Sequence, residues 1–196
     1  VARYRSLFPE ARIHCFEPSP QSFERLAAKV GGNAWTHLHR LALADREGIM
    51  KLNINRSDAT NSLLSSDARG AFFWGENKLE TDTTIDVATD TVDRIRQQQS
   101  VDHIDILKID VQGAEYAVLQ GAEATLRQHA IDVLYMEVIV APTYVGQHRF
   151  HEYLERLDSL GYVIFDFYNR ARKNGRLIQA DALFVSDSFL RKHERP

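Results

Sequence analysis

The chain has 196 residues, of which 44% are hydrophobic and 26% charged, so it is long enough for one hydrophobic core and too apolar for a disordered protein. Its 24 Lys and Arg against 27 Asp and Glu give a formal charge of −3, which argues against nucleic acid or an anionic membrane as a partner. No apolar run reaches the roughly 18 residues of a membrane span. The single cysteine cannot form an internal disulfide, so we expect a soluble single domain, residues 1–196, in the reducing cytoplasm.

The first part of the chain alternates helical patterns with short apolar runs. Apolar residues at helical spacing predict a helix from residue 1 that Pro9 stops, and residues 13–16 predict a strand that ends at Glu17. Two prolines then open a helix that runs to Val30 and is expected to end at Gly31. Further strands are predicted at about 38–43 and, from strict alternation, at 50–54.

The middle of the chain is the least regular. Residues 56–84 predict a long loop that is functional or mobile, in which residues 61–64 could form a lid. A second irregular connection is expected from residue 87, with a short capped helix at 90–95. Residues 104–109 then form a near-continuous apolar run, which is typical of a parallel strand buried on both faces.

The last part of the chain predicts two helices, a strand and a hairpin. One helix is expected over 116–126, a buried strand over 133–140, and an amphipathic helix that begins at Phe150 and ends at Gly161. The apolar runs 162–167 and 182–185 are joined by a polar loop that leaves no room for a crossover helix, so they should pair antiparallel.

Alternating strands and helices predict an α/β fold with an open, mostly parallel sheet, helices on both faces and a C-terminal antiparallel hairpin. Ligands of such sheets bind beyond the carboxyl ends of the strands. Three acidic residues lie at or near such ends: Glu17, Asp110 and Glu137.

Each acid has a functional and a structural interpretation. A carboxylate at Glu17 can accept hydrogen bonds from both hydroxyls of a ribose, or it can cap the next helix. Asp110 can face a cationic cofactor, take a proton from a bound hydroxyl, or act as a cap. Glu115 lies in a first helical turn, where the helix dipole favours acids. Glu137 lies inside an apolar strand, where an acid is costly unless it is paired or faces a ligand, and we favour the ligand.

The histidines do not predict a metal site. His148 and His151 share a helix face but have no third ligand at metal spacing, and His37 and His39 offer at most half a site on one strand. We expect these side chains to be ordinary surface or rim residues.

Several motifs, taken in order, resemble those of the FkbM-type methyltransferases, and the resemblance covers nearly the whole chain. They are Ile13-His14-Cys15-Phe16-Glu17-Pro18-Ser19-Pro20, Leu41-Ala42-Leu43-Ala44-Asp45, Asn61-Ser62-Leu63-Leu64, Ile106-Leu107-Lys108-Ile109-Asp110-Val111-Gln112-Gly113-Ala114-Glu115, Val118-Leu119-Gln120-Gly121-Ala122, Met136-Glu137 and Leu160-Gly161-Tyr162.

The resemblance implies a class I, Rossmann-like enzyme that uses S-adenosylmethionine to methylate a hydroxyl of a sugar, a glycan or a secondary metabolite. Glu17 and Pro18 would then hold the cofactor ribose. The segment with Ala42, Leu43 and Asp45 would lie beside the adenine, and Asp110 near the methionine portion and the transferred methyl.

The chemistry of such a transfer asks for alignment and for one base. The sulfonium methyl is already electrophilic, so the protein mainly holds the acceptor oxygen in line with it and takes up the hydroxyl proton. Asp110 is the first choice for that base, with Glu115 and Glu137 in reserve.

One expected motif is missing. The family carries a glycine-rich loop of Asp-Val-Gly-Ala-Asn type on a strand upstream of the helix with which this chain begins. That strand would lie between those bearing Glu17 and Asp110, so we expect an N-terminally truncated domain whose sheet has a gap. Two alternatives remain open: a non-catalytic α/β binding or scaffold domain that has lost the cofactor loop, and a nucleotide-dependent oxidoreductase, which would rest on Glu17 alone.

Overall fold

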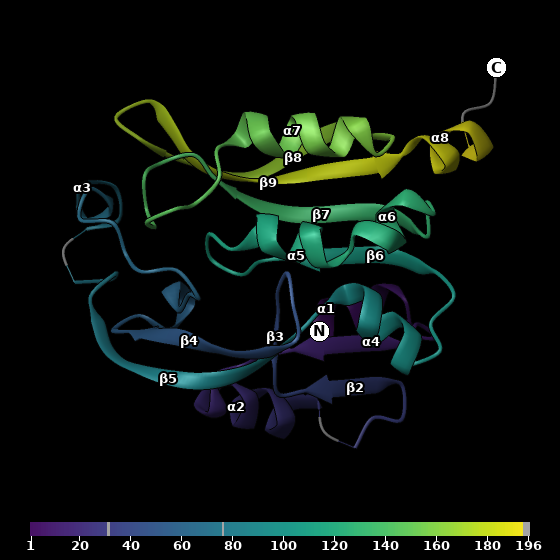
Figure 1. Cartoon of the computed structure of the whole chain (residues 1–196), viewed down its shortest axis with the longest axis horizontal. Coiled ribbons are helices and arrows are strands. Elements are labelled where there is room, and N and C mark those ends of the chain that lie inside the picture. The colour runs from purple at the N-terminus through teal and green to yellow at the C-terminus, as the bar shows by residue number, and fades with distance from the viewer. Residues whose placement is uncertain (31, 76, 194–196) are drawn as a thin grey trace.

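The computed structural model describes residues 1–30, 32–75 and 77–193 (Figure 1). The helices are α1 (Ala2–Leu7), α2 (Pro20–Val30), η1 (Asp58–Thr60), α3 (Gly70–Trp74), α4 (Val92–Gln98), α5 (Glu115–Gly121), α6 (Glu123–Arg127), α7 (Phe150–Ser159) and α8 (Asp187–His193). The strands are β1 (Ile13–Phe16), β2 (Thr36–His39), β3 (Ala42–Leu43), β4 (Gly48–Asn55), β5 (Thr81–Asp90), β6 (Ile104–Ile109), β7 (Ile131–Ile139), β8 (Tyr162–Lys173) and β9 (Arg176–Ser186).

The strands form three sheets, in the orders β1-β2, β3-β5-β4 and β6-β7-β9-β8. The α/β class and the C-terminal hairpin are confirmed. The single, mostly parallel sheet is not, because only three of the six pairings among the described residues are parallel. The difference has two causes. Strands β4 and β5 pair antiparallel with each other, and β9 lies between β7 and β8 and is antiparallel to both.

Several predicted elements are confirmed in detail. The short helix α4 is capped by Thr91, whose Oγ1 accepts a hydrogen bond from the N–H of Arg94 at 3.1 Å. Helix α7 ends before Gly161, which has the positive φ of 74° expected after a helix C-terminus. The β8-β9 turn has positive φ at both Asn174 and Gly175, as a tight hairpin turn requires. The predicted helix end at Gly31 lies outside the described residues.

The irregular structure expected between residues 81 and 90 is wrong, because these residues form β5. Their apolar signal is weak, since most outward-facing positions are exposed Thr or Asp and the first buried residue is Val87. Pairing with β4, where Ile85 lies opposite Leu52, stabilises the strand instead. Strand formation here depends on a partner more than on local sequence.

Two predicted elements are each divided in two in the structure. The strand expected at 38–43 becomes β2 and β3, and the helix expected at 116–126 becomes α5 and α6 with a break at Ala122. Gly121 lies directly against β3: a Cβ atom there would lie 2.0 Å from the carbonyl oxygen of Ala44. Only glycine allows this approach of α5 to the strand.

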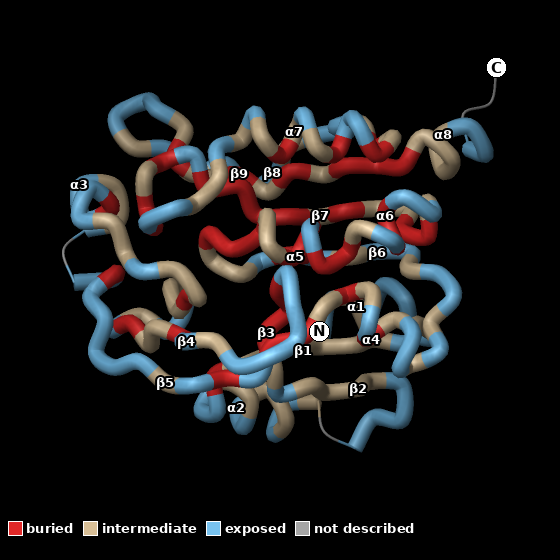
Figure 2. Tube along the Cα trace, in the orientation of Figure 1, coloured by how far each residue is buried: buried red, intermediate tan, exposed pale blue. Residues whose placement is uncertain are grey.

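The core lies between helices α4 to α7 and one face of the four-stranded sheet. It includes Ile109, Leu134, Met136, Leu119 and Leu157, all almost fully buried. Figure 2 shows the continuous buried stretches along β7 and β9. The opposite face is less complete, with Ile106 37% and Tyr168 41% exposed, so helices cover it less fully than the predicted two-sided arrangement requires.

Strand β6 is not buried on both faces, and that prediction is wrong. Ile106, Asp105 and Lys108 are exposed. Among the described residues β6 pairs only with β7, and β1 only with β2. Both strands line the same cavity, with Glu17 following one strand and Asp110 following the other.

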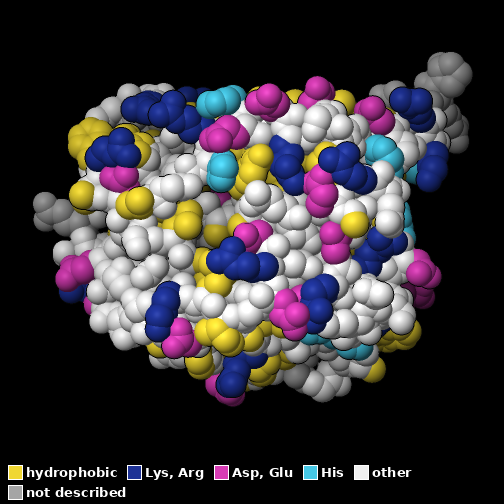
Figure 3. Space-filling model, viewed as in Figure 1, with side chains coloured by type: hydrophobic (Ala, Val, Ile, Leu, Met, Phe, Trp, Pro, Cys, Tyr) yellow, Lys and Arg dark blue, Asp and Glu magenta, His cyan; other side chains and the backbone are white. Residues whose placement is uncertain are grey.

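On the face of the molecule shown in Figure 3, Lys and Arg side chains are interspersed with Asp and Glu side chains. Within residues 1–30, 32–75 and 77–193, none of the helices combines the length and apolarity needed to cross a membrane.

Candidate functional site

A cavity of about 1190 Å³ lies between β1 and β6 and extends to the loops that follow them. Its volume is above the ~300–1,000 Å³ of a usual ligand pocket. The predicted site residues that line it are Glu17, Pro18, Ala42, Leu43, Asp110 and Glu137. Asp45 and Glu115 do not line it.

Glu17 follows β1 and has one of its two carboxylate oxygens engaged by the chain. Its Oε1 accepts a hydrogen bond from the N–H of Ser19 at 2.9 Å, which helps to order the start of α2. Burial raises the pKa of Glu17, and the Ser19 bond opposes that rise. Among the described residues no side chain or backbone donor contacts Oε2, so the carboxylate can accept a further hydrogen bond from a ligand in the cavity.

The segment expected beside an adenine is only partly in the cavity. Ala42 and Leu43 form β3, are 6% and 8% exposed, and present an apolar wall. Asp45 is exposed beyond the strand, where its carboxylate pairs with Arg46 at 2.9 Å. The two apolar residues therefore belong to the candidate site by geometry, and Asp45 does not.

Asp110 lies at the carboxyl end of β6 and faces both solvent and cavity. Its side chain is 43% exposed, and Oδ2 pairs with the Lys108 ammonium at 2.6 Å. Its Oδ1 accepts a longer hydrogen bond, 3.2 Å, from the side-chain amide of Gln112. Asp110 is thus a charged group already paired with a cation.

Glu137 is the buried acid of the cavity. It projects from β7, is 7% exposed, and each carboxylate oxygen accepts from one amide: Oε2 from Gln112 at 2.6 Å and Oε1 from Gln179. Burial raises its pKa to about 8, and the charges of neighbouring acids, chiefly Asp110, contribute in the same direction. An acid with this pKa exchanges a proton near neutral pH, as a general base must.

Glu115 serves the backbone instead of the cavity. It is 1% exposed, and Oε1 accepts from the N–H groups of Val111 and Gly113 at 3.2 and 3.0 Å. Burial raises its pKa to about 7, and the backbone hydrogen bonds oppose the rise. Its position indicates that it shapes the loop between β6 and α5.

Three further residues that line the cavity were not proposed as site residues by sequence reasoning: Gln112, Tyr144 and Gln179. Gln112 stands inside one of the motifs quoted above, so the sequence could have drawn attention to it. Its contacts, however, depend on β7 and on the loop that follows β7. Gln179 reaches Glu137 only through the register of β7 and β9, which pairs Ile139 with Gln179. No local pattern reveals such a partner.

The segment 61–64, expected as a candidate lid, is held in place. The side-chain amide of Asn53 on β4 donates to the carbonyl oxygens of Ser62 and Leu64 at 3.2 and 3.0 Å. Ser62 Oγ donates to the carbonyl of Gln112 at 2.6 Å. These bonds make the segment a fixed wall of the cavity.

The histidines are engaged with one another and with other side chains. His37 stacks on His14, and His14 Nδ1 lies 3.0 Å from His39 Nε2. His148 lies just before α7, and its Nδ1 is 2.9 Å from Oε1 of Glu152 in the first turn of that helix.

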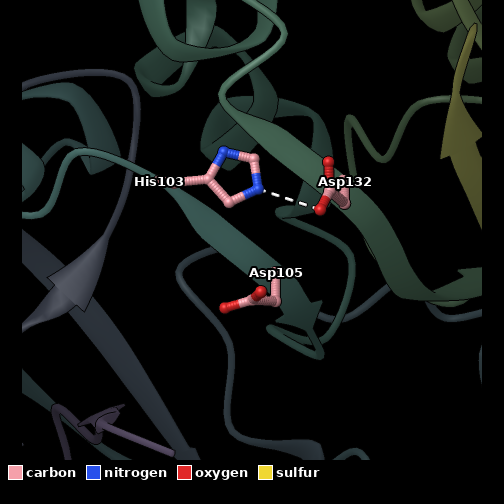
Figure 4. A group of neighbouring side chains, drawn as sticks. All are labelled: His103, Asp105 and Asp132. Atoms are coloured by element: carbon pink, nitrogen blue, oxygen red, sulfur yellow. Dashed lines mark hydrogen bonds and ion pairs between the residues drawn. The ribbon is translucent and has the colours of Figure 1, made fainter. Parts of the chain in front are cut away.

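A separate group, His103, Asp105 and Asp132, lies at the start of β6 and β7 (Figure 4). His103 Nε2 and Asp132 Oδ2 are 2.9 Å apart, while Asp105 is exposed beside them. The ring nitrogen and the carboxylate oxygens are close enough for one cation, but the His103–Asp132 pair accounts for their proximity, and we assign the group no role.

Comparison with known proteins decides the family. The family model described as the methyltransferase FkbM domain matches residues 1–164. The chain belongs to the FkbM methyltransferase family. This confirms the resemblance drawn from the motifs.

Two relatives of this FkbM family member are informative. It is 28% identical over 163 residues to the 2-O-methyltransferase NoeI of Sinorhizobium fredii (strain NBRC 101917 / NGR234), a match that covers 80% of this chain and 65% of NoeI. The chain therefore spans less than two thirds of the length of this curated relative. Its fold is similar to the crystal structure of methyltransferase FkbM from Methylobacillus flagellatus KT, with a TM-score of 0.52 at 14% identity over 94% of this chain and 39% of that one.

Proposed function

We propose that this FkbM family protein transfers a methyl group from S-adenosylmethionine to a hydroxyl of a small-molecule or glycan acceptor. The observation that carries the proposal is the meeting of Glu17, Asp110 and Glu137 on one cavity, at the carboxyl side of strands from two different sheets. The name of the relative NoeI, a 2-O-methyltransferase, supports an oxygen acceptor.

The residues of the cavity suit the cofactor. Glu17 offers an unengaged carboxylate oxygen for ribose hydroxyls, and Ala42 with Leu43 offers an apolar wall for a planar base. Asp110 supplies negative charge for the cationic portion. When bound, S-adenosylmethionine supplies the electrophilic methyl, so the chain's own residues have only to orient the acceptor and remove its proton.

We assign proton removal to Glu137 in preference to Asp110. Glu137 is buried in the cavity, oriented by two amides and titrates near neutral pH, whereas Asp110 is half-exposed and paired with Lys108. A base that is buried and oriented before substrate arrives needs little reorganisation in the transition state.

We also propose that a further parallel strand fills the space between β1 and β6 and carries a cofactor-binding loop. Among the residues that the structure describes, β1 pairs only with β2 and β6 only with β7, and both strands line the cavity, which supports this. The test compares the 196-residue chain with the same chain extended by the residues encoded immediately before Val1. We expect tighter cofactor binding and higher thermal stability in the extended protein, and equal values would contradict the proposal.

The function itself is tested by calorimetric titration with S-adenosylmethionine and with its demethylated product, followed by transfer of isotope-labelled methyl to a panel of hydroxyl compounds. Binding and label transfer are expected for the extended protein. Binding without transfer to any acceptor would favour the non-catalytic scaffold, and binding of a nicotinamide nucleotide alone would favour the oxidoreductase.

Replacing Glu17 by Ala is expected to weaken cofactor binding by about 10- to 100-fold, because a hydrogen-bonded carboxylate is lost from the ribose position. Calorimetric Kd values measure this, and the melting temperature is the control. A large fall in melting temperature with unchanged Kd would show that Glu17 only caps α2.

Replacing Asp110 by Asn is expected to weaken cofactor binding several-fold and to leave the rate at saturating cofactor within about threefold of the wild type, because only a charge near the cofactor is removed. Separate Kd and kcat measurements decide this. A collapse of kcat with unchanged Kd would make Asp110 the base, as the sequence alone favours.

A further inference from the structure

Gln112 occupies an unusual backbone position in the loop between β6 and α5. Its φ is +55°, in the left-handed region that disfavours most side chains, and the following Gly113 has a φ of +95°. Gly113 cannot carry a side chain, because a Cβ would lie 2.6 Å from the ring of Tyr144. A non-glycine residue held in this region needs surrounding contacts to keep it there, and such positions cluster at functional sites.

The side-chain amide of Gln112 makes three hydrogen bonds within the site. Its Nε2 donates to Glu137 Oε2 at 2.6 Å and to Asp110 Oδ1 at 3.2 Å. Its Oε1 and the carbonyl oxygen of Thr60 lie 3.0 and 3.1 Å from the hydroxyl of Tyr144, whose single proton the two acceptors share. Because the two carboxylates require donors, they determine which way the amide points, and the oxygen is left for Tyr144.

The backbone of Gln112 is tied to a third part of the cavity wall. Its carbonyl accepts the Ser62 hydroxyl at 2.6 Å, and Tyr144 contacts the carbonyl of Thr60 at 3.1 Å. Gln112 thereby links Asp110, after β6, and Glu137, on β7, to the two loops that contain Ser62 and Tyr144.

We propose that Gln112 is a positioning residue that holds the Glu137 carboxylate toward the acceptor side of the cavity and links it to Tyr144. The proposal rests on the proposed methyl transfer, in which Glu137 is the base. Without the amide of Gln112, the Glu137 carboxylate keeps only Gln179 as a hydrogen-bond donor and gains freedom to rotate. The neutral amide that lies between the carboxylates of Glu137 and Asp110 is lost as well.

The charged and titratable groups around Glu137 set the background for the test. Asp110, Glu115 and Asp181 oppose its ionisation, Lys108 favours it, and the Tyr144 phenol is a further neighbour whose own pKa is raised by burial. Gln112 contacts two of these groups, Asp110 and Tyr144, so its replacement also removes their hydrogen bonds, but Gln112→Gly leaves every charge around Glu137 in place.

The experiment measures Glu137 ionisation by carbon-detected NMR of its side-chain carboxyl in the 196-residue chain, and kcat against pH in the extended protein. Gln112→Gly removes the amide and relieves the positive φ, and Gln112→Glu keeps the volume but replaces the donor by a carboxylate. Ser100→Gly is the matched control, because Ser100 also has a positive φ, of 50°, is exposed and does not line the cavity.

In Gln112→Gly the midpoint of Glu137 titration should rise by about one pH unit, since a charge-assisted hydrogen bond to its ionised form is lost. In Gln112→Glu the midpoint should rise further, because a second carboxylate then lies beside Glu137. The pH midpoint of kcat should rise with it, and kcat at neutral pH should fall about 10- to 100-fold with cofactor Kd unchanged. Ser100→Gly should leave all three values as in the wild type.

An unchanged Glu137 midpoint in Gln112→Gly would overturn the proposal, as would an equal shift in Ser100→Gly. The titration needs no turnover, so it separates the two hypotheses: absence of methyl transfer by the wild type rejects the proposed function, while the NMR midpoint still decides whether Gln112 positions Glu137.

Discussion

Replacing Glu137 by Gln is expected to slow methyl transfer by about 10²- to 10⁴-fold, because the variant cannot accept the hydroxyl proton. Cofactor affinity should change little, since the base acts on the acceptor. Single-turnover rates at saturating cofactor measure the effect. Glu155→Gln, at an exposed position of α7 outside the cavity, is the matched control and should keep wild-type rates. A kcat within threefold of the wild type in Glu137→Gln would exclude Glu137 as the base.

The pH dependence of the wild type tests the same assignment from another side. Burial raises the pKa of Glu137 to about 8, so the ionised, active form accumulates as the pH rises through that value. The rate should therefore increase from about pH 7 and level off above about pH 9.

Stability should change with pH in the opposite sense to the rate. The folded protein holds the Glu137 proton more tightly than the unfolded chain, whose ordinary value is 4.5. The stabilising contribution is thus complete below about pH 4.5 and is lost as the pH rises through about 8. Glu137→Gln does not titrate, so denaturant unfolding at a series of pH values should show a flatter profile for the variant.

Replacing Gly121 by Ala should have the largest effect on folding. The added Cβ would lie 2.0 Å from the carbonyl oxygen of Ala44, a backbone atom that cannot rotate away, so α5 and β3 must separate. We expect a loss of about 3 kcal/mol, which in a chain of this size lowers the melting temperature by roughly 6–12 °C. Because β3 carries Ala42 and Leu43, cofactor affinity should fall as well.

Gln120→Ala is the control for Gly121→Ala. Gln120 is the preceding residue of α5 and is exposed, so its truncation should leave the unfolding free energy within about 0.5 kcal/mol of the wild type. If both variants had the melting temperature of the wild type, α5 would not approach β3 as closely as the structure shows.

Local patterns were sufficient for elements whose signal lies within one short segment. The capped helix α4, the helix before Gly161 and the hairpin turn at Asn174-Gly175 each depend on residues a few positions apart. Local patterns failed for β5 and for the break at Ala122, because a polar strand needs β4 beside it and the break follows from contact between Gly121 and β3.

The candidate site likewise has features that local sequence patterns reveal and features that only the tertiary contacts reveal. Glu17, Asp110 and Glu137 were recognised as acids at or near strand ends, and the motif order led to the FkbM family. The choice among them required burial and contacts: Glu115 supports a backbone loop, Asp110 pairs with Lys108, and Glu137 lies in the cavity between two amides.

The amino-acid sequence by itself determined the α/β class, the family and the acids that merit attention, because residue type and short spacing are local properties. Only the tertiary structure decided the division of the described strands into three sheets, the exposure of β6 and the partners of Glu137. Those features depend on strand register and on side chains far apart in the chain. Gln112 and Gln179 meet Glu137 from 25 and 42 residues away, a distance over which sequence spacing carries no geometric information.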